Sequence, residues 1–334
     1  MLRKLEECYG VSGMETQVCS YLKNALSPFC TRLWEDSMGS LHAEKKADKD
    51  AKTILIAAYM DEPGIIITRI TEDGYLKFET VGRIDAAFLV SKRVCIHGID
   101  GIISLKAIHL ATKKERETPV KADQLLIDIG ASSREEAEQA VEIGDYGAFD
   151  SRFQEFGDGF VKGRALAGRA GCAVASEILQ NDWACNLHVI FAVQREIGNR
   201  GMAAAAWEIK ADITVVLDGT EARIWAGPQD RPEAGRGAVL LLKTGAGTAL
   251  QTELQGLVEE AEHRGIPVQT YYTREKGQET VLRQTGYGHH CLCLGIPVRY
   301  SKTTAQVASI SDMQAMRELV KLVIEQTAKQ EETK

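Results

Sequence analysis

After Gly159 the sequence alternates between short β-rich runs and helical segments, and this alternation constrains the fold more than any other feature. Such alternation is typical of an α/β fold, in which helices cover both faces of a sheet. The apolar run at 53–58 has the character of a further buried strand of this sheet, and residues 16–26 predict a helix before it. The other predicted strands lie near 186–194, 212–218, 238–243, 267–272 and 289–295, and the other predicted helices near 169–180, 201–209, 248–264, 277–285 and 311–328.

Between Gly64 and about Ile129 the pattern changes to short β-rich runs separated by turn signals such as Glu72-Asp73-Gly74. A capping-box spacing from Ser133 to Glu136 then predicts a helix that continues to about residue 142. We therefore predict one discontinuous α/β domain, residues 1–63 and 155–334, interrupted by a β-rich oligomerisation domain over 64–154. The predicted strands of this insertion lie at 64–70, 75–81, 92–97, 100–105 and 124–129.

Length and charge exclude several classes of protein. The 334 residues suffice for about two domains. A net charge of −7 gives no support to nucleic-acid binding, whose proteins usually carry a basic patch. We expect no membrane association, because no apolar run approaches the roughly 18 residues that span a bilayer. The early charges of Met1–Glu7 do not resemble a signal peptide, so we expect a cytoplasmic protein.

The eight cysteines are scattered and form no Cys-x-x-Cys pair, which favours reduced core residues over a disulfide framework. On a strand, His289, Cys291 and Cys293 would share one face, so a metal site is conceivable there. A buried strand is the favoured interpretation, because Leu292 and Leu294 continue the apolar pattern.

Five segments place polar residues at or near the ends of predicted strands, where open α/β sheets form their sites. They are Ala58-Tyr59-Met60-Asp61-Glu62-Pro63-Gly64, Arg164-Ala165-Leu166-Ala167-Gly168-Arg169-Ala170-Gly171-Cys172, Val193-Gln194-Arg195-Glu196-Ile197-Gly198, Val216-Leu217-Asp218-Gly219 and Ile296-Pro297-Val298-Arg299-Tyr300-Ser301-Lys302.

In this order the segments resemble the M42 family of metallo-aminopeptidases, which includes glutamyl aminopeptidase, FrvX and TET-type proteins. The resemblance covers roughly residues 10–325 and includes Ile127–Ser132 in the insertion. It implies a peptidase-type α/β domain with helices on both faces of a mixed sheet, and a small inserted β-barrel (PDZ-like) domain. It also implies two divalent metals, zinc or cobalt, bridged by an aspartate, with a glutamate as general base.

Several positions that the resemblance assigns to this chemistry carry other residues. Tyr59 stands at a histidine ligand, Ala167 at the bridging aspartate, Arg195 at the general base and Lys302 at the last histidine ligand. Glu196 and Asp218 are retained at ligand positions, and Asp61 at the supporting aspartate. The substrate-pocket stretch is matched only loosely around Glu279, and Arg299 is a second candidate for substrate contact.

We therefore expect no bound metal or other cofactor. Arg195 and Lys302 would neutralise the retained carboxylates in an ion-pair network, which matters because unpaired buried charges are costly. The same cations would oppose metal binding, since a dication and a monocation about 4 Å apart repel by roughly 8 kcal/mol at an effective dielectric constant of about 20. We interpret Tyr59 as a packing residue rather than a phenolate ligand. Arg195 remains open between a structural ion pair and a grip on an anionic ligand.

The leading hypothesis is an inactive pseudo-peptidase that binds peptides or serves as a structural subunit. The resemblance implies a homo-oligomer such as a tetrahedral dodecamer, and an active paralogue is another conceivable partner. The alternative is an active metal-dependent aminopeptidase that releases N-terminal residues from peptides. A third interpretation, a different hydrolase using Glu196 and Asp218 as an acid/base pair, has no geometric support in the sequence.

Overall fold

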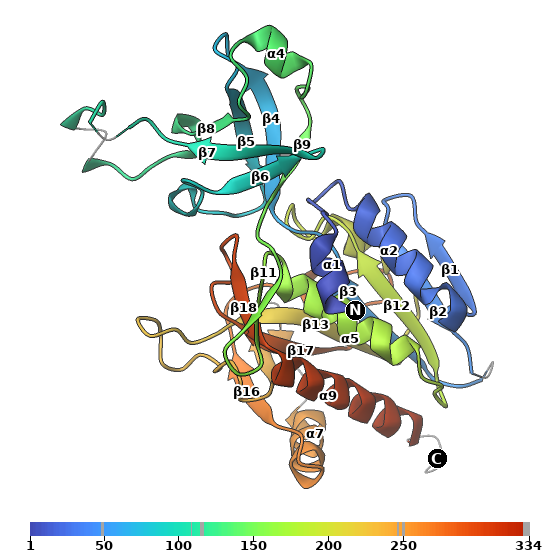
Figure 1. Cartoon of the computed structure of the whole chain (residues 1–334). Coiled ribbons are helices and arrows are strands. Elements are labelled where there is room, and N and C mark those ends of the chain that lie inside the picture. The colour runs from blue at the N-terminus through green and yellow to red at the C-terminus, as the bar shows by residue number, and fades with distance from the viewer. Residues whose placement is uncertain (48–49, 108, 114–116, 246, 249–250, 330–334) are drawn as a thin grey trace.

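The computed structural model describes residues 1–329 except 48–49, 108, 114–116, 246 and 249–250. It contains a nine-stranded mixed sheet and a separate closed six-stranded barrel, so the predicted α/β fold with an inserted barrel is confirmed (Figure 1). No helix in the described part of the chain is long and apolar enough to cross a membrane.

The large sheet has the order β1-β2-β12-β3-β13-β17-β14-β15, with β16 paired to β14. Its central strands β12, β3, β13 and β17 run parallel, so their carboxyl ends share one edge. The strands are β1 (Arg32–Glu35), β2 (Leu41–Lys45), β3 (Thr53–Tyr59), β12 (Asn186–Ala192), β13 (Ile213–Glu221), β14 (Ala238–Thr244), β15 (Gly247–Thr248), β16 (Val268–Tyr272) and β17 (Cys291–Val298).

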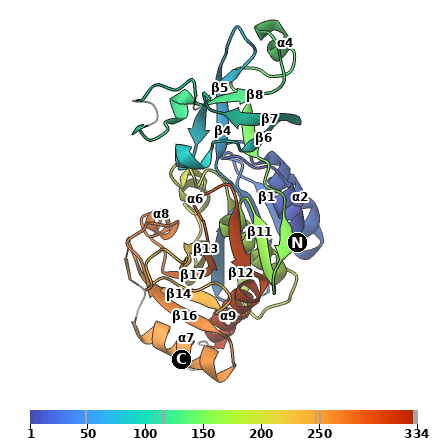
Figure 2. The same ribbon diagram turned by 60° about the vertical axis from the view of Figure 1, so that its left-hand side comes forward.

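Alternating side chains of the buried strand β3 supply two cores, one on each face of the sheet. Ile54 and Ile56 pack into the larger core with α2 (Thr16–Leu26), α5 (Leu166–Leu179) and α9 (Ile310–Lys329). Leu55 and Ala57 pack into a smaller core with α6 (Arg200–Ala205) and α8 (Glu279–Leu282). Figure 2 shows α6 and α8 on one side of the sheet and α2 on the other. Two further helices are α1 (Leu2–Glu7) and α7 (Gln251–His263).

The barrel closes in the order β4-β5-β8-β7-β6-β9 around its own apolar core. Its strands are β4 (Gly64–Ile70), β5 (Leu76–Val81), β6 (Arg93–Ile96), β7 (Ile99–Ser104), β8 (Leu126–Asp128) and β9 (Tyr146–Phe149). The chain leaves it through β10 (Gln154–Phe156) and β11 (Phe160–Gly163), which form a three-stranded sheet with β18 (Gln306–Ser309).

Several predicted bounds are wrong. Ser133 caps α4 (Arg134–Glu138) as expected, but the helix ends before residue 142, and only a turn continues to Val141. The predicted helix 277–285 shrinks to α8, and 201–209 shrinks to α6. The predicted start of helix 248–264 falls partly outside the described residues. Cys291 and Cys293 lie within β17, whose residues are all buried, as the buried-strand interpretation predicts.

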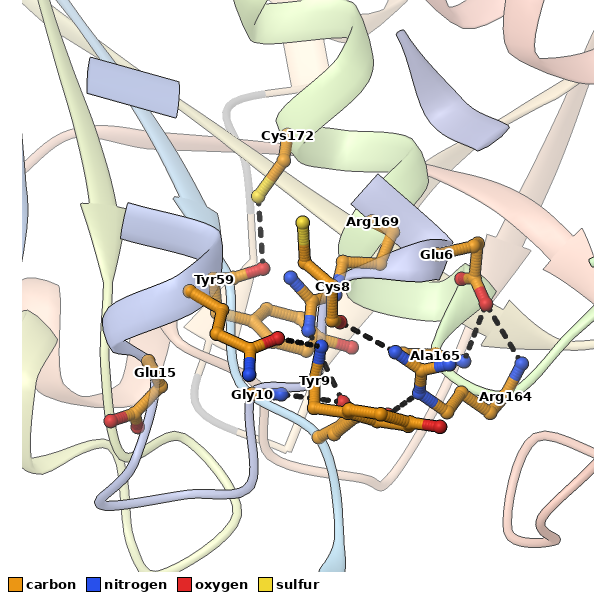
Figure 3. Close-up of polar contacts among 12 residues, drawn as sticks. Glu6, Cys8, Tyr9, Gly10, Glu15, Tyr59, Arg164, Ala165, Arg169 and Cys172 are labelled. Carbon is orange, nitrogen blue, oxygen red and sulfur yellow. Dashed lines mark hydrogen bonds and ion pairs between the residues drawn. The ribbon is translucent and has the colours of Figure 1, made fainter. Parts of the chain in front are cut away.

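A buried network of ion pairs joins the N-terminal segment to the connection between sheet and barrel. Glu62 lies between β3 and β4, and its carboxylate accepts hydrogen bonds from Arg164 at 2.6 Å, Arg169 at 3.4 Å and the amide of Gly10 at 2.7 Å. Glu6 accepts from the amide of Arg164 at 2.8 Å (Figure 3). Arg169 on α5 is fully buried, so removing the carboxylate of Glu62 would leave a buried charge without its ion pair.

Replacing Glu62 by Gln is therefore expected to lower the free energy of unfolding by about 3–5 kcal/mol, measured by guanidinium denaturation. The matched control is Glu155→Gln, which breaks the exposed pair with Arg3. That control should cost no more than about 1 kcal/mol. Equal losses in the two variants would show that the Glu62 network contributes nothing special to stability.

Candidate functional site

Segments far apart in the sequence meet at the carboxyl edge of the parallel strands. Tyr59 ends β3, Asp218 lies in β13, and Arg195 and Glu196 lie in the segment that follows β12, separated from its end by two residues. Because β12, β3 and β13 are neighbours, their side chains converge. Ala167 lies in the first turn of α5 against the same edge, and a Cβ atom placed on Gly219 would come within 2.5 Å of its Cβ.

The side chain of Arg195 contacts Tyr59, Glu196 and Asp218, and these four residues form the Arg195 cluster. Its Nη1 donates to Glu196 at 2.7 Å and its Nη2 to Asp218 at 3.4 Å. Its guanidinium also lies over the ring of Tyr59, 4.7 Å from the centroid. Tyr59 in turn donates its hydroxyl proton to Asp218 at 2.9 Å. The guanidinium therefore bridges the two carboxylates that the family resemblance assigns to metals.

Burial controls the protonation of the cluster. It raises the pKa of Tyr59 well above its usual value, so the phenol stays neutral. Burial also raises the pKa of Asp218, while the charge of Arg195 and the hydrogen bond from Tyr59 oppose that rise. Tyr59 is thus a neutral packing residue and hydrogen-bond donor.

Asp61 lies behind the cluster, almost completely buried. Its Oδ2 accepts from the amide of Glu196 at 2.9 Å, while Oδ1 has no partner among the described residues. Burial raises the pKa of Asp61 to about 7, although backbone hydrogen bonds from Glu196 and Arg195 lower it. The carboxyl group therefore holds the turn at Arg195 and Glu196 through this backbone hydrogen bond.

The prediction that Lys302 neutralises the retained carboxylates is wrong. Its Nζ lies 2.7 Å from Glu275 and 3.7 Å from Glu221, and its side chain is 61% exposed. Lys302 belongs to the loop after β17. Its acidic partners are Glu275, which lies in the loop after β16, and Glu221, which ends β13. Arg195 alone therefore pairs with Glu196 and Asp218 within the described structure.

Of the two predicted substrate contacts, the structure brings only one to the site. Glu279 begins α8, is buried, and accepts from the amide of Gly277 at 3.0 Å. It lines the same cleft as Arg195 and Asp218. Arg299 instead places its guanidinium over the ring of Phe160, 5.0 Å from the centroid, and does not line this cleft.

The cleft has a volume of about 210 Å³, and its walls carry both signs of charge. Five charged residues of the wall were not predicted from the sequence. Four of them lie in loops, whose positions no local pattern reveals, and the fifth, Glu221, ends β13. The basic side chains are Arg195, Arg231, Arg274 and Lys276, and the acidic ones are Asp218, Glu221, Glu275 and Glu279.

The residues present do not fit a two-metal centre. A bridging ligand needs an oxygen or nitrogen donor, and Ala167 has none. The Tyr59 hydroxyl is neutral and already donates to Asp218, and a guanidinium holds the remaining carboxylates. No group of three or more His, Cys, Asp or Glu residues in the described part of the chain is arranged to hold a metal ion.

Comparison with known proteins gives one consistent result. The family model for the M42 glutamyl aminopeptidase matches residues 39–319. FrvX of Escherichia coli strain K12 is 33% identical, with 96% of this chain and 93% of that protein aligned.

Solved structures agree. A TET aminopeptidase from a marine sediment archaeon, Thaumarchaeota archaeon SCGC AB-539-E09, superposes with a TM-score of 0.92 at 26% identity, covering 98% of each chain. The TET1 peptidase of Pyrococcus horikoshii, which can assemble into a tetrahedron or a large octahedral shell, superposes with a TM-score of 0.86 at 24% identity. That match covers 97% of this chain and 98% of the other.

Replacing Arg195 by Met should leave Glu196 and Asp218 facing each other without a cation. We expect a loss of about 2–4 kcal/mol in the free energy of unfolding, because the three side chains are only 30%, 11% and 15% exposed. The loss should be greater at pH 8 than at pH 5. Burial raises the folded-state pKa of Asp218 and the charge of Arg195 opposes that rise, so removing Arg195 raises this pKa further. The folded variant then binds the proton more tightly than the wild type does, and it loses more stability as the carboxyl ionises.

The control is Arg223→Met, which breaks the more exposed Arg223–Glu233 pair and should cost no more than about 1 kcal/mol. An Arg195→Met variant as stable as wild type at both pH values would contradict the proposed role of the guanidinium.

Proposed function

Because the chain belongs to the M42 glutamyl aminopeptidase family, we propose that it is a pseudo-peptidase, which keeps the family fold to bind peptides without hydrolysing them. The observation that carries this proposal is the position of the Arg195 guanidinium between Glu196 and Asp218. In the family resemblance these are the positions of the general base and of two metal ligands.

The chemistry of the substituted residues supports the proposal. Hydrolysis of a peptide needs a group that accepts a proton from the attacking water. An arginine side chain remains protonated in proteins and offers only donors, so Arg195 cannot take that role. Ala167 cannot bridge metals, and its amide is already used as a donor to Gln306 at 2.9 Å.

The cleft beside the cluster is suited to a zwitterionic ligand. Its carboxylates would attract the amino group of a peptide, and its arginine and lysine side chains would attract a carboxylate. Glu279 is the best-placed carboxylate, since it is buried and held by the Gly277 amide. A short peptide with both termini free is therefore the expected ligand.

Hydrolysis of alanyl-, leucyl-, lysyl- and glutamyl-p-nitroanilides tests the absence of catalysis. With zinc, cobalt or manganese present, we expect no release of product above the rate in buffer. Chelator-sensitive release by wild-type protein would overturn the proposal. Calorimetric titration tests binding: a tripeptide with free termini should bind at least tenfold more tightly than its acetylated and amidated form.

A rebuilt variant gives the sharpest comparison. Tyr59→His, Ala167→Asp, Arg195→Glu and Lys302→His together restore the residue types that the family resemblance assigns to these positions. We expect this variant to bind zinc and gain aminopeptidase activity, while the variant with Arg195 unchanged and the other three substitutions stays inactive. Activity in that triple variant would show that Arg195 does not block the site.

We also propose that the chain forms a homo-oligomer, with the domain over residues 64–154 contributing contacts. This barrel domain carries exposed apolar side chains, Ile143 at 66% and Ile102 at 52%. The assembly of the structurally similar TET1 peptidase into a tetrahedron or an octahedral shell supports the proposal of a homo-oligomer. Light scattering on the full-length protein should give a mass several times 36.6 kDa, and a value near 36.6 kDa would contradict it.

A further inference from the structure

A second cavity of about 420 Å³ lies at the other end of the sheet, away from the Arg195 cluster. It is formed where the edge strands β1 and β2 and their neighbour β12 face the segment that follows α6. The lining residues are Trp34, Asp36, His42, His188, Ala204, Ala205, Trp207, Glu208 and Ile209. None of them belongs to the site described above.

Strand alternation explains why these residues share one face. In β2, Leu41 and Ala43 point into the larger core, so His42 points to the opposite face. Register then pairs Trp34 with His42, and His188 with Glu44, across neighbouring strands. The rings of Trp34, His42 and His188 thus come into contact with one another on this face of the sheet.

The two histidines share a hydrogen bond, and each lies near a carboxylate. Nδ1 of His42 lies 3.0 Å from Nε2 of His188, and Nε2 of His42 lies 3.4 Å from Asp36. Nδ1 of His188 lies 3.6 Å from Glu44. Burial, together with electrostatic interactions with His42 and Arg32, lowers the pKa of His188 to about 3, so this imidazole is neutral.

The charged side chains that line this cavity differ in sign from those that line the cleft beside Arg195: the cleft has both signs, and this cavity has carboxylates. Its lining includes the carboxylates of Asp36 and Glu208 and contains no lysine or arginine. Glu208 forms no ion pair with another described residue. Of the cations nearest in sequence, Arg32 already lies over the ring of the lining residue Trp34, with its guanidinium 4.1 Å from the ring centroid, and Lys210 lies over the ring of Tyr287.

The indole ring of Trp207 lines the cavity and is largely exposed to solvent. Its side chain is exposed (62% for the residue), although an indole normally gains from burial or from a polar partner. An indole face attracts cations, and it does so more strongly when carboxylates lie nearby. An anion would meet the two carboxylates, so the lining disfavours it.

From this arrangement we infer that the cavity is a second ligand site, which binds an organic cation such as a guanidinium group against Trp207, Glu208 and Asp36. An arginine side chain, as a free amino acid derivative or in a peptide, has the matching chemistry. Its planar guanidinium stacks on an indole and donates to carboxylates at the same time. This site shares no lining residue with the proposed peptide cleft, so either proposal can be wrong without affecting the other.

The test uses N-acetyl-arginine methylamide as the probe and N-acetyl-citrulline methylamide as its uncharged match. Binding to full-length protein is followed by the indole N–H signals of the tryptophans in NMR spectra. We expect the Trp207 signal to shift with a Kd of about 1 mM or tighter for the arginine probe, and at least tenfold weaker binding of the citrulline probe.

The variants Trp207→Ala and Glu208→Gln should each weaken binding about fivefold or more. Both side chains are exposed, so neither change should disturb folding. The matched control is Trp225→Ala, which removes a 91% exposed indole that does not line the cavity and should leave the Kd unchanged. Equal affinity for the two probes, no shift of the Trp207 signal up to 20 mM, or equal weakening by Trp225→Ala would overturn the inference.

Discussion

One guanidinium determines the state of the candidate site. Three parallel strands and the segment after β12 bring Tyr59, Glu196 and Asp218 to one edge of the sheet, where two carboxylates with little access to water need a counter-charge. Arg195 supplies that charge through two hydrogen bonds and a contact with the aromatic ring. Divalent ions would meet the same need, and on our proposal the guanidinium would oppose them by its charge and by occupying the space between the carboxylates. On our proposal, Arg195 would replace the proton acceptor and also oppose metal binding, while Tyr59 and Ala167 would remove ligands.

The rest of the molecule keeps this edge in place. Glu62, three residues after the end of β3, binds two arginines that come from the end of β11 and from α5. These ion pairs connect the N-terminal segment, the helix that carries Ala167 and the connection to the barrel. We expect the stability of this scaffold to come from the buried apolar strands and from the Glu62 ion pairs, with a further contribution from the Arg195 ion pairs at the site.

The sequence allowed prediction of the layers of the fold, because largely apolar runs such as 53–58 and 186–194 are typical of buried strands and alternate with helical segments. It also allowed prediction of which segments meet, since parallel strands share one edge. The partner of Lys302 was predicted wrongly, because a flexible exposed side chain can pair with any nearby acid and Glu275 lies in a loop. Short elements such as β1 and β2 were not predicted. The hydrogen bond between His42 and His188 was therefore also missed, since it depends on cross-strand register.

The most direct test of the central claim is anomalous diffraction at the zinc edge from crystals grown with excess zinc. The account predicts no anomalous peak between Glu196 and Asp218, and electron density for the Arg195 guanidinium at hydrogen-bonding distance from both. Two peaks about 3.5–4 Å apart at that place, with Arg195 turned away, would contradict it and would restore the metallo-aminopeptidase interpretation.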